Sequence, residues 1–519
     1  MCRNVGRRPL QLQQGRNHVR LLRDALLAIF AGLLLTAAFP NLDVWFLAPL
    51  AVAIITWVQW RSTGGRSFLM GVLFGLTFFL SLMPWLRVIG SDAWIAASVF
   101  CAIWVGLLGW ATARLTRLPW APIWVGFAWV AMEAIRENLP VLGFTWGRLA
   151  FSQSTSPLGG FAAWGGAVGV TFLVAVAGAL LAQASRADTW PSTFAPAATA
   201  VALVILAGVI PGPTLPTTGS LQVALIQGGT PQTGLGDRDV RREVLANHAS
   251  VTTDLGRDIG AGVATRPDLV LWPENSVDFD PFQDLEAART IQGAADAVGT
   301  PILVGAVMDD PDDPTLRANV AILWEPDSGP QQIYVKQRLV PFGEFIPLRS
   351  LIASRVDRLD RVRRDFAPGD EPGLFPVSGA VIGNVICFEV AYDAAISEVV
   401  RGGADILTVQ TNNATWAGMN QINQQLAIER LRARETGRSL GVAATTGATV
   451  AFDPRGREIA SVPIDDVGYV VADLPRVSAQ TPGSILGPPF TVAAIVLTVL
   501  GLVLTWTPIA RRALTRVEG

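Results

Sequence analysis

The stretch YVKQRLVPFGEF, residues 334–345, contains Lys336, the only lysine among the 40 lysine and arginine residues of this 519-residue chain. A lysine ammonium is a compact point charge whose pKa shifts on burial, whereas an arginine guanidinium is a wide fork that stays charged. A chain that uses arginine at every other cationic position keeps one lysine either by chance or because a chemical step requires it. The second explanation predicts that other reactive groups gather around this stretch.

Long apolar runs flank the polar segment that contains Lys336. Half of the residues are hydrophobic, and runs of about 18 or more apolar residues are typical of helices that cross a bilayer. The sequence predicts a membrane α-helical bundle of eight spans, at residues 25–40, 43–60, 67–86, 93–112, 120–136, 161–182, 194–211 and 488–507. A cleavable signal peptide is not expected, because further spans follow the first and no small-residue cleavage site precedes them.

The arginines of the short segments between spans give the expected orientation. With a cytoplasmic N-terminus, fourteen of them lie on the cytoplasmic side and three on the other, as the positive-inside rule requires. The net charge of −2 gives no indication of nucleic-acid binding. The expected order is a cytoplasmic arm (1–24), seven spans (25–211), a Pro/Gly/Thr linker (212–220), an extracytoplasmic domain (221–485), the eighth span (488–507) and a cytoplasmic tail (508–519).

The 221–485 segment alternates short apolar runs, such as LQVALIQ (221–227) and ANVAILWE (318–325), with stretches of helical periodicity. Because both faces of several predicted strands are apolar, helices should cover a sheet on each side, or two sheets should pack together. We therefore expect an α/β layered fold. Residues 342–373 show no clear period and are expected to form a long loop with six arginines, a candidate lid.

Three short motifs follow predicted strands of this domain: LWPEN with Glu274, YVKQRLVPFGEF with Lys336 and Glu344, and VICFEV with Cys387 and Glu389. A thiol, a cation and a proton-accepting carboxylate are the components of nucleophilic acyl transfer. The ammonium favours the thiolate, and together with the backbone N–H of Phe388 it can stabilise an oxyanion. Glu274 can accept the thiol proton.

Each of these residues also has a simpler explanation. A cysteine in an apolar strand is more often part of a core, a glutamate at a strand end can cap a helix, and a lone lysine can be a solvated edge-strand charge. Taken together, however, the one cysteine of this domain and the one lysine of the chain occur in the same type of context. The two histidines, His18 and His248, are isolated in the sequence, so a Ser-His-Asp or zinc-histidine site is poorly supported.

The motifs WPEN, YVKQRLVPFGEFIP and VICFEV, in this order, resemble the Glu–Lys–Cys motifs of the nitrilase (carbon–nitrogen hydrolase) superfamily. Together with the predicted spans, the LVPFGE form narrows the resemblance to the apolipoprotein N-acyltransferase family. The arginine-rich composition suggests an actinobacterial-type member. The resemblance covers nearly the whole chain, because EAIRENLPVLGFTWGRLAFSQ (133–153) and TNNATW (411–416) are similar to two further segments of that family.

This resemblance implies a nitrilase-like α-β-β-α sandwich on the extracytoplasmic side of a bacterial cytoplasmic membrane. It implies a ping-pong N-acyltransferase in which Cys387 takes the sn-1 acyl chain of a phospholipid as a thioester. The α-amine of a diacylglyceryl-cysteine at the N-terminus of an apolipoprotein then takes the acyl chain, in lipoprotein maturation. By the same resemblance Glu274 is the base, Lys336 stabilises the oxyanion, and Glu344 and Glu389 support the triad. No cofactor or metal is expected, and we expect a monomer.

The two further segments supply candidate substrate-binding residues: Asn412, Asn413, Trp416, Glu133, Arg136 and Trp146. Ionisable residues at the edge of a span mark a functional site by default, but an i,i+3 pair at a helix end explains Glu133 and Arg136 equally well. The chain departs from the family pattern at Phe388, where many members have tyrosine, at Leu235, where a tryptophan is usual, and at Trp416, which is displaced by one position. These departures affect the expected substrate preference more than the chemistry.

Two other functions remain open at this point. A membrane-anchored nitrilase-type amidase would hydrolyse a small amide with the same triad and water as the second nucleophile, although the predicted spans exceed what an anchor needs. A lipid- or lipoprotein-binding chaperone is the non-catalytic alternative, and the retention of all three triad residues argues against it. A transporter has less support, because the spans show no convincing internal repeat.

Overall fold

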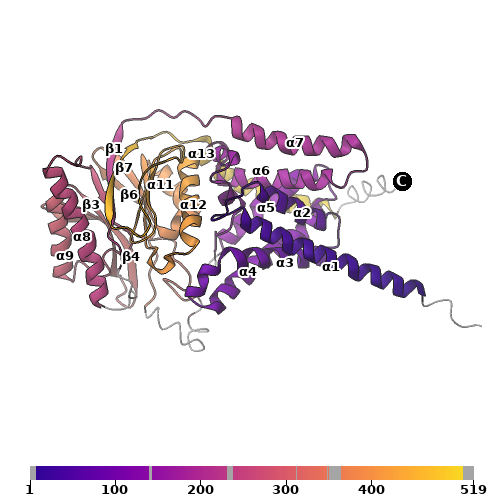
Figure 1. The fold of residues 1–519 in the computed structure, drawn as a ribbon, viewed down its shortest axis with the longest axis horizontal. Helices are drawn as coiled ribbons and strands as arrows, with labels where there is room; N and C mark the ends of the chain where they lie inside the picture. Colours follow the sequence, from indigo (N-terminus) through magenta and orange to yellow (C-terminus); the bar gives the residue numbers. More distant parts are fainter. Residues whose placement is uncertain are drawn as a thin grey trace, which may run out of the picture.

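The computed structural model describes residues 8–139, 143–230, 238–310, 312–347, 349 and 364–506. It has two parts, a helical bundle and an α/β domain, which lie side by side along the longest axis of the molecule (Figure 1). The helical bundle consists of α1 (Arg8–Ala37), α2 (Leu47–Gln59), α3 (Gly64–Leu82), α4 (Ser91–Leu115), α5 (Ala121–Glu137), α6 (Ala162–Ala184), α7 (Trp190–Val209) and the C-terminal α13 (Pro482–Leu504).

Five bundle helices are long and apolar enough to cross a membrane: α3, α4, α6 with the preceding 3₁₀ turn η3 (Pro157–Phe161), α7 and α13. The others are α1, α2 with 13 residues, and α5 with 17 residues. Each predicted span overlaps one of the bundle helices, but length and composition single out five, so the count of eight stays a prediction. Residues 8–24, the described part of the predicted arm, are helical and continuous with the rest of α1.

Small residues allow the bundle helices to approach closely. A Cβ atom added to Gly71 of α3 would lie 2.5 Å from the carbonyl oxygen of Val105 in α4, and one added to Gly109 of α4 would lie 2.4 Å from the carbonyl oxygen of Ser67. Helices gain no hydrophobic free energy when they associate inside a bilayer, so their association there depends on such close van der Waals packing. The glycines of α3 and α4 therefore favour a bundle whose helices associate inside a bilayer.

The α/β domain contains two sheets of six strands each. The first has the order β12-β1-β2-β3-β4-β5 and the second β11-β10-β9-β8-β7-β6. Their strands are β1 (Ser220–Gln227), β2 (Leu269–Leu271), β3 (Ile302–Asp309), β4 (Arg317–Glu325), β5 (Gly329–Val335), β6 (Gly373–Val377), β7 (Ala380–Ile386), β8 (Ile406–Thr411), β9 (Leu440–Ala444), β10 (Thr449–Phe452), β11 (Glu458–Val462) and β12 (Gly468–Pro475). The helices are α8 (Arg238–Gly260), α9 (Leu285–Val298), α11 (Asp393–Arg401) and α12 (Gln421–Thr436).

The two sheets pack face to face, with one pair of helices on each outer side. Side chains of a strand alternate between its two faces, and β1 shows the result. Leu221 and Leu225 join the core between the sheets, whereas Ala224 and Ile226 join the core beneath α8 and α9. The pair α11 and α12 lies on the other side of the sandwich, next to the helical bundle (Figure 1). This is the α-β-β-α arrangement that the family resemblance implies, and it agrees with the α/β layered fold predicted from the strand pattern.

The sequence-based expectations for this domain differ from the structure in a few places. The run 440–453 is a hairpin of β9 and β10 rather than one strand, because Gly447 with φ +117° reverses the chain between them. Strands β6, β11 and β12 and helix α11 were not expected from their short or polar patterns. Much of the predicted loop 342–373, Leu235 and the predicted tail 508–519 lie outside the described residues.

Candidate active site

Lys336 lies at the centre of a buried cluster formed at the ends of strands of the first sheet. It follows β5, and its Nζ is 2.9 Å from Oε1 of Glu274, which follows β2, and 2.9 Å from Oε1 of Glu344. Asn319 on the intervening strand β4 donates to the same two oxygens, at 2.8 Å and 2.7 Å. Two carboxylates are therefore held together by one ammonium and one amide.

The charges of this cluster make Lys336 a permanent cation. Burial lowers the pKa of its ammonium, but the carboxylates of Glu274 and Glu344 outweigh this effect and hold the pKa well above its ordinary value. The remaining oxygens of the two carboxylates point to different places. Oε2 of Glu274 accepts from the backbone N–H of Asn412 at 3.0 Å, and Oε2 of Glu344 accepts from the backbone N–H of Val340 at 2.7 Å.

Cys387 stands on a sharp turn between β7 and the 3₁₀ helix η6 (Cys387–Ala391). Its φ of +52° is left-handed, a conformation that costs a non-glycine residue about 1 kcal/mol or more. Burial and the carboxylate of Glu274 raise the pKa of the half-buried thiol, although Lys336 acts to lower it. The resting group is thus a thiol, with a carboxylate beside it that can take its proton.

Thr411, the last residue of β8, provides a further contact to the sulfur. Its hydroxyl lies 3.3 Å from Sγ of Cys387 and 3.2 Å from Oδ1 of Asn413. Nε2 of Gln425 donates to the oxygen of this hydroxyl at 3.1 Å, and also to Oε1 of Glu429 at 3.0 Å. The oxygen of this hydroxyl accepts from Gln425, and its single proton can be donated to the sulfur or to Oδ1 of Asn413.

Glu389 holds the two chain segments of the cluster together. Its carboxylate accepts the backbone N–H groups of Gln337 and Arg338 on one side and of Ile386 on the other, all at 2.8–2.9 Å. The hydroxyl of Tyr334 donates to it as well. Glu389 therefore fixes the segment that carries Lys336 against the turn that carries Cys387.

Comparison with known proteins identifies the family. Residues 31–180 match the model of the apolipoprotein N-acyltransferase N-terminal domain, and residues 245–481 match that of the carbon-nitrogen hydrolases. The chain is 36% identical over 486 residues to the apolipoprotein N-acyltransferase of Mycolicibacterium smegmatis, which covers 89% of this chain and 81% of that protein. It belongs to the apolipoprotein N-acyltransferase family.

Other similarities are lower. The apolipoprotein N-acyltransferase of Photobacterium profundum is 29% identical over 493 residues, or 89% of this chain and 91% of that protein. Among solved structures, an amidase from Nesterenkonia sp. aligns with a TM-score of 0.35 and 17% identity, covering 51% of this chain and 93% of that chain.

Phe388, the residue after Cys387, connects the two domains of this chain. The ring of Phe388 stacks on Trp146 of the helical bundle, with centroids 5.3 Å apart and planes 6° apart. Trp85 packs edge-on against Trp146 and Trp416, with centroids at 5.5 Å and 5.0 Å. Oε1 of Gln424 accepts the indole N–H of Trp146 at 2.6 Å and that of Trp85 at 3.3 Å. Phenylalanine at 388 provides a stacking face, and a tyrosine hydroxyl is not needed for it.

The candidates Glu133 and Arg136 hold the bundle loop that carries Trp146. Glu133 accepts the backbone N–H of Leu149 at 2.8 Å and lies 3.6 Å from the guanidinium of Arg148. Arg136 donates to the carbonyl oxygen of Trp146 at 3.0 Å. Among the described residues, Arg148 is thus the ion-pair partner of Glu133, whereas Arg136, the i,i+3 neighbour of Glu133, contacts the carbonyl oxygen of Trp146.

The asparagines of the TNNATW segment are engaged locally. Oδ1 of Asn412 accepts from Thr445 at 2.9 Å and from the backbone N–H of Ala414 at 3.2 Å. Its own backbone N–H orients Glu274. Asn412 and Asn413 therefore shape the wall of the site next to the carboxylate and the sulfur, and Trp416 continues that wall into the aromatic group of Trp85 and Trp146.

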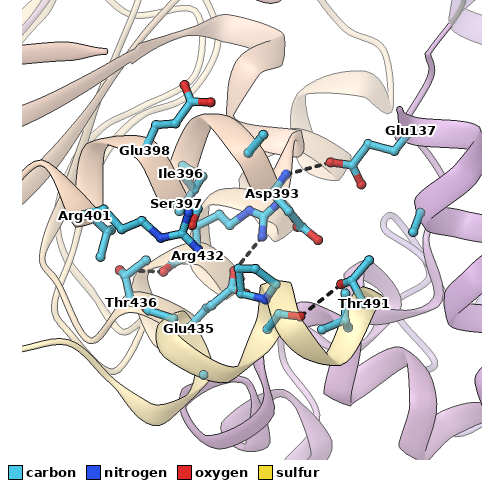
Figure 2. A pocket seen from close by; sticks show the side chains of 18 of the residues that line it. Glu137, Asp393, Ile396, Ser397, Glu398, Arg401, Arg432, Glu435, Thr436 and Thr491 are labelled. Atoms are coloured by element: carbon cyan, nitrogen blue, oxygen red, sulfur yellow. Dashed lines mark hydrogen bonds and ion pairs between the residues drawn. The ribbon is translucent and has the colours of Figure 1, made fainter. Parts of the chain in front are cut away.

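A buried ion network joins the α/β domain to the bundle on the other side of η6 (Figure 2). Asp393 at the start of α11 is 2.7 Å from Arg148 of the bundle and 2.8 Å from Arg432 of α12. Glu137 of α5 accepts the backbone N–H of Asp393 at 2.8 Å, and Arg432 is 2.5 Å from Glu435. Most of these residues line a cavity of about 260 Å³ between the domains. Two guanidiniums are thus shared among three carboxylates, and these contacts tie the α/β domain to the bundle.

Several residues of the site were not identified from the sequence. The sequence gives one indication of Asn319, which is the only amide side chain within the apolar strand ANVAILWE. Thr411, Gln424 and Gln425 left none, because polar residues of their types are common at strand ends and on helices. Their proximity to Cys387 and to the bundle tryptophans arises only when β8 and α12 pack beside η6.

Proposed function

We propose that Glu274, Lys336 and Cys387 are the catalytic residues with which this N-acyltransferase moves an acyl chain from a phospholipid to the α-amine of the diacylglyceryl-cysteine of an apolipoprotein. The observation that carries the proposal is the placement of the thiol. Cys387 lies beside a carboxylate and an ammonium, and the next residue, Phe388, stacks on the bundle residue Trp146. Both substrates are lipids or lipid-anchored, so a reactive thiol must face the bundle.

The first half-reaction forms a thioester. Glu274 takes the proton from Sγ of Cys387, and the thiolate attacks the sn-1 ester carbonyl carbon. The ammonium of Lys336 and the backbone N–H of Phe388 stabilise the negative charge that develops on the carbonyl oxygen. The tetrahedral intermediate collapses, the ester C–O bond breaks, and the leaving alkoxide takes the proton back from Glu274, which releases a lysophospholipid.

The second half-reaction uses the same groups in reverse order. The α-amine of the acceptor attacks the thioester carbonyl and gives a proton to Glu274, while Lys336 again stabilises the oxyanion. The C–S bond breaks, the amide forms, and the thiolate recovers a proton from Glu274. Glu344 and Glu389 act as positioning residues, and Thr411 supports the thiolate by a hydrogen bond.

The topology expected from the arginines supports this chemistry. Eight spans, at α1–α7 and α13, place the α/β domain between the seventh and the eighth, on the extracytoplasmic side of the membrane, with both termini in the cytoplasm. In this proposal the linker precedes β1, the eighth span is α13, and the enzyme is a monomer.

The test is intact mass spectrometry of the purified protein after incubation with bacterial phospholipid and no acceptor. We expect a mass gain of one acyl chain that hydroxylamine removes and that a diacylglyceryl-cysteine peptide discharges. Cys387→Ala should show no gain, whereas Cys101→Ala, which removes the buried thiol of α4, should behave as wild type. Wild-type protein that never gains an acyl chain but hydrolyses a small amide would refute the proposal and support the amidase.

A further inference from the structure

A second cavity, of about 540 Å³, lies where three of the candidate membrane helices meet the α/β domain. Ser156 and Pro157 line it at the start of η3 and α6, Gly208 lines it at the end of α7, and Thr481 lines it at the start of α13. The opposite wall belongs to the α/β domain and consists of the end of α12 and the turn between β10 and β11. In the topology proposed above, the cavity sits at the level where helices leave the bilayer and where lipid headgroups lie.

The α/β wall of this cavity is positively charged. It contains three arginines, Arg434, Arg455 and Arg457, and one carboxylate, Asp453. Asp453 is already held by Arg457 at 2.7 Å and by the backbone N–H groups of residues 455 and 457 at 2.8 Å. Nε of Arg434 donates to the carbonyl oxygen of Arg455 at 3.0 Å, which fixes this side chain against the turn. The described lining thus carries two more positive than negative charges.

The bundle wall adds one helix N-terminus to this positive charge. Thr481 is the N-cap of α13 and accepts the backbone N–H of Ser484 at 3.0 Å. Helix N-termini carry a partial positive charge and favour anions. A Cβ atom added to Gly160 or Gly212 would meet nothing within 4 Å, so the cavity is open beside them.

An apolar helix surface leads away from the cavity along the bundle. Helix α7 is the least buried of the candidate spans, with 11% of its most apolar window buried. Val201, Ile205 and Val209 on this helix are each more than half exposed. An anionic group in the cavity, with hydrocarbon chains attached, would find its chains next to this surface.

We propose that this cavity binds the phosphate headgroup of an anionic phospholipid as a second lipid site, separate from the thiol. The separation between this cavity and the thiol of Cys387 can be estimated along α12. Gln425 reaches the Thr411–Cys387 contact, and Arg434 is nine residues further along the same helix, or roughly 13 Å at 1.5 Å per residue. We assign a lipid held by Arg434 and Arg455 to anchoring rather than to acyl donation. It fastens the α/β domain to the bilayer surface.

The experiment is native mass spectrometry of protein released from nanodiscs of phosphatidylcholine with increasing fractions of phosphatidylglycerol. Arg455→Gln/Arg457→Gln removes two arginines of the turn. Arg257→Gln/Arg289→Gln removes two arginines from α8 and α9, on the helices farthest from the bundle (Figure 1), and is the matched control. We expect the turn variant to bind phosphatidylglycerol roughly tenfold or more weakly than wild type, and the control variant to bind it as wild type does.

Three outcomes decide the proposal. Equal phosphatidylglycerol retention by wild type and the turn variant would overturn it. Glycerol 3-phosphate that binds lipid-free protein in detergent as tightly as phosphatidylglycerol does would show an anion site without lipid recognition, and would overturn it as well. Cys387→Ala should retain phosphatidylglycerol as wild type does, because this site does not depend on the thioester. Failure of the acyl-transfer proposal can therefore be distinguished from failure of this one.

Discussion

The matched pair Glu274→Gln and Glu344→Gln separates the base from the supporting carboxylate. Both glutamates give one oxygen to Lys336 at 2.9 Å and to Asn319, and both accept a backbone N–H with the other oxygen. Each glutamine substitution therefore removes one negative charge next to the Lys336 ammonium and places an NH₂ group against one backbone N–H. The common cost is about 1–3 kcal/mol of folding stability for each variant.

The difference between the two variants measures proton transfer. The Glu274 carboxylate acts on the Cys387 thiol, whereas the printed contacts of the Glu344 carboxylate are with Lys336, Asn319 and the backbone N–H of Val340. A general base contributes about 10²–10⁴-fold to a rate, or roughly 3–5 kcal/mol of barrier. We expect acyl-enzyme formation by Glu274→Gln to be at least about 10²-fold slower than by Glu344→Gln.

The assay is the time course of the acyl-chain mass gain without acceptor, followed for both variants at one pH. Thermal unfolding of each variant in the same detergent controls for the shared loss of stability. Equal acylation rates for the two glutamine variants would refute the assignment of Glu274 as the base, because their ion-pair and backbone losses are the same.

Three further predictions concern contacts around the site and in the rest of the fold. Thr411→Val should slow acylation roughly tenfold, since the thiolate loses a hydrogen-bond donor. The control is Thr408→Val on the same strand, which removes a hydroxyl that donates to Asn384 and should leave the rate unchanged. Equal acylation rates for the two variants in the mass-gain assay would contradict this prediction. Burial lowers the pKa of His248 to about 4. As the pH falls below ~6.5, the unfolded chain therefore binds a proton at this histidine before the folded chain does. About 2 kcal/mol of folding stability should be lost when the pH falls from 7 to 5. His248→Leu should remove that loss in thermal unfolding at the two pH values, and a variant with the same pH dependence as wild type would exclude His248 as its cause. Asp393→Asn removes one carboxylate partner from each of two buried arginines and should lower folding stability by about 3 kcal/mol. Asp254→Asn, in an exposed ion pair, should lower it by less than about 1 kcal/mol. Indistinguishable melting temperatures for the two variants would show that the network does not hold the domains together.

The sequence determined the components of this protein. Periodicity and apolar length are local properties, so they predicted the bundle helices and most strands of the α/β domain. The proposed catalytic residues Glu274, Lys336 and Cys387 could be selected because each stands in a short motif at a strand end, and because the only lysine of the chain is one of them. The family followed from the order of these motifs.

Only the tertiary structure decided how these components meet. The partner of Glu133 is Arg148 rather than its helix neighbour Arg136, because the chain folds back after α5 and buries the loop that follows. The bond from Thr411 to the sulfur depends on two strands that pair across the second sheet, and the stacking of Phe388 on Trp146 joins residues far apart in the chain. Such contacts have no local signal, since they form only when segments far apart in the sequence pack within the bundle, within the α/β domain or against each other.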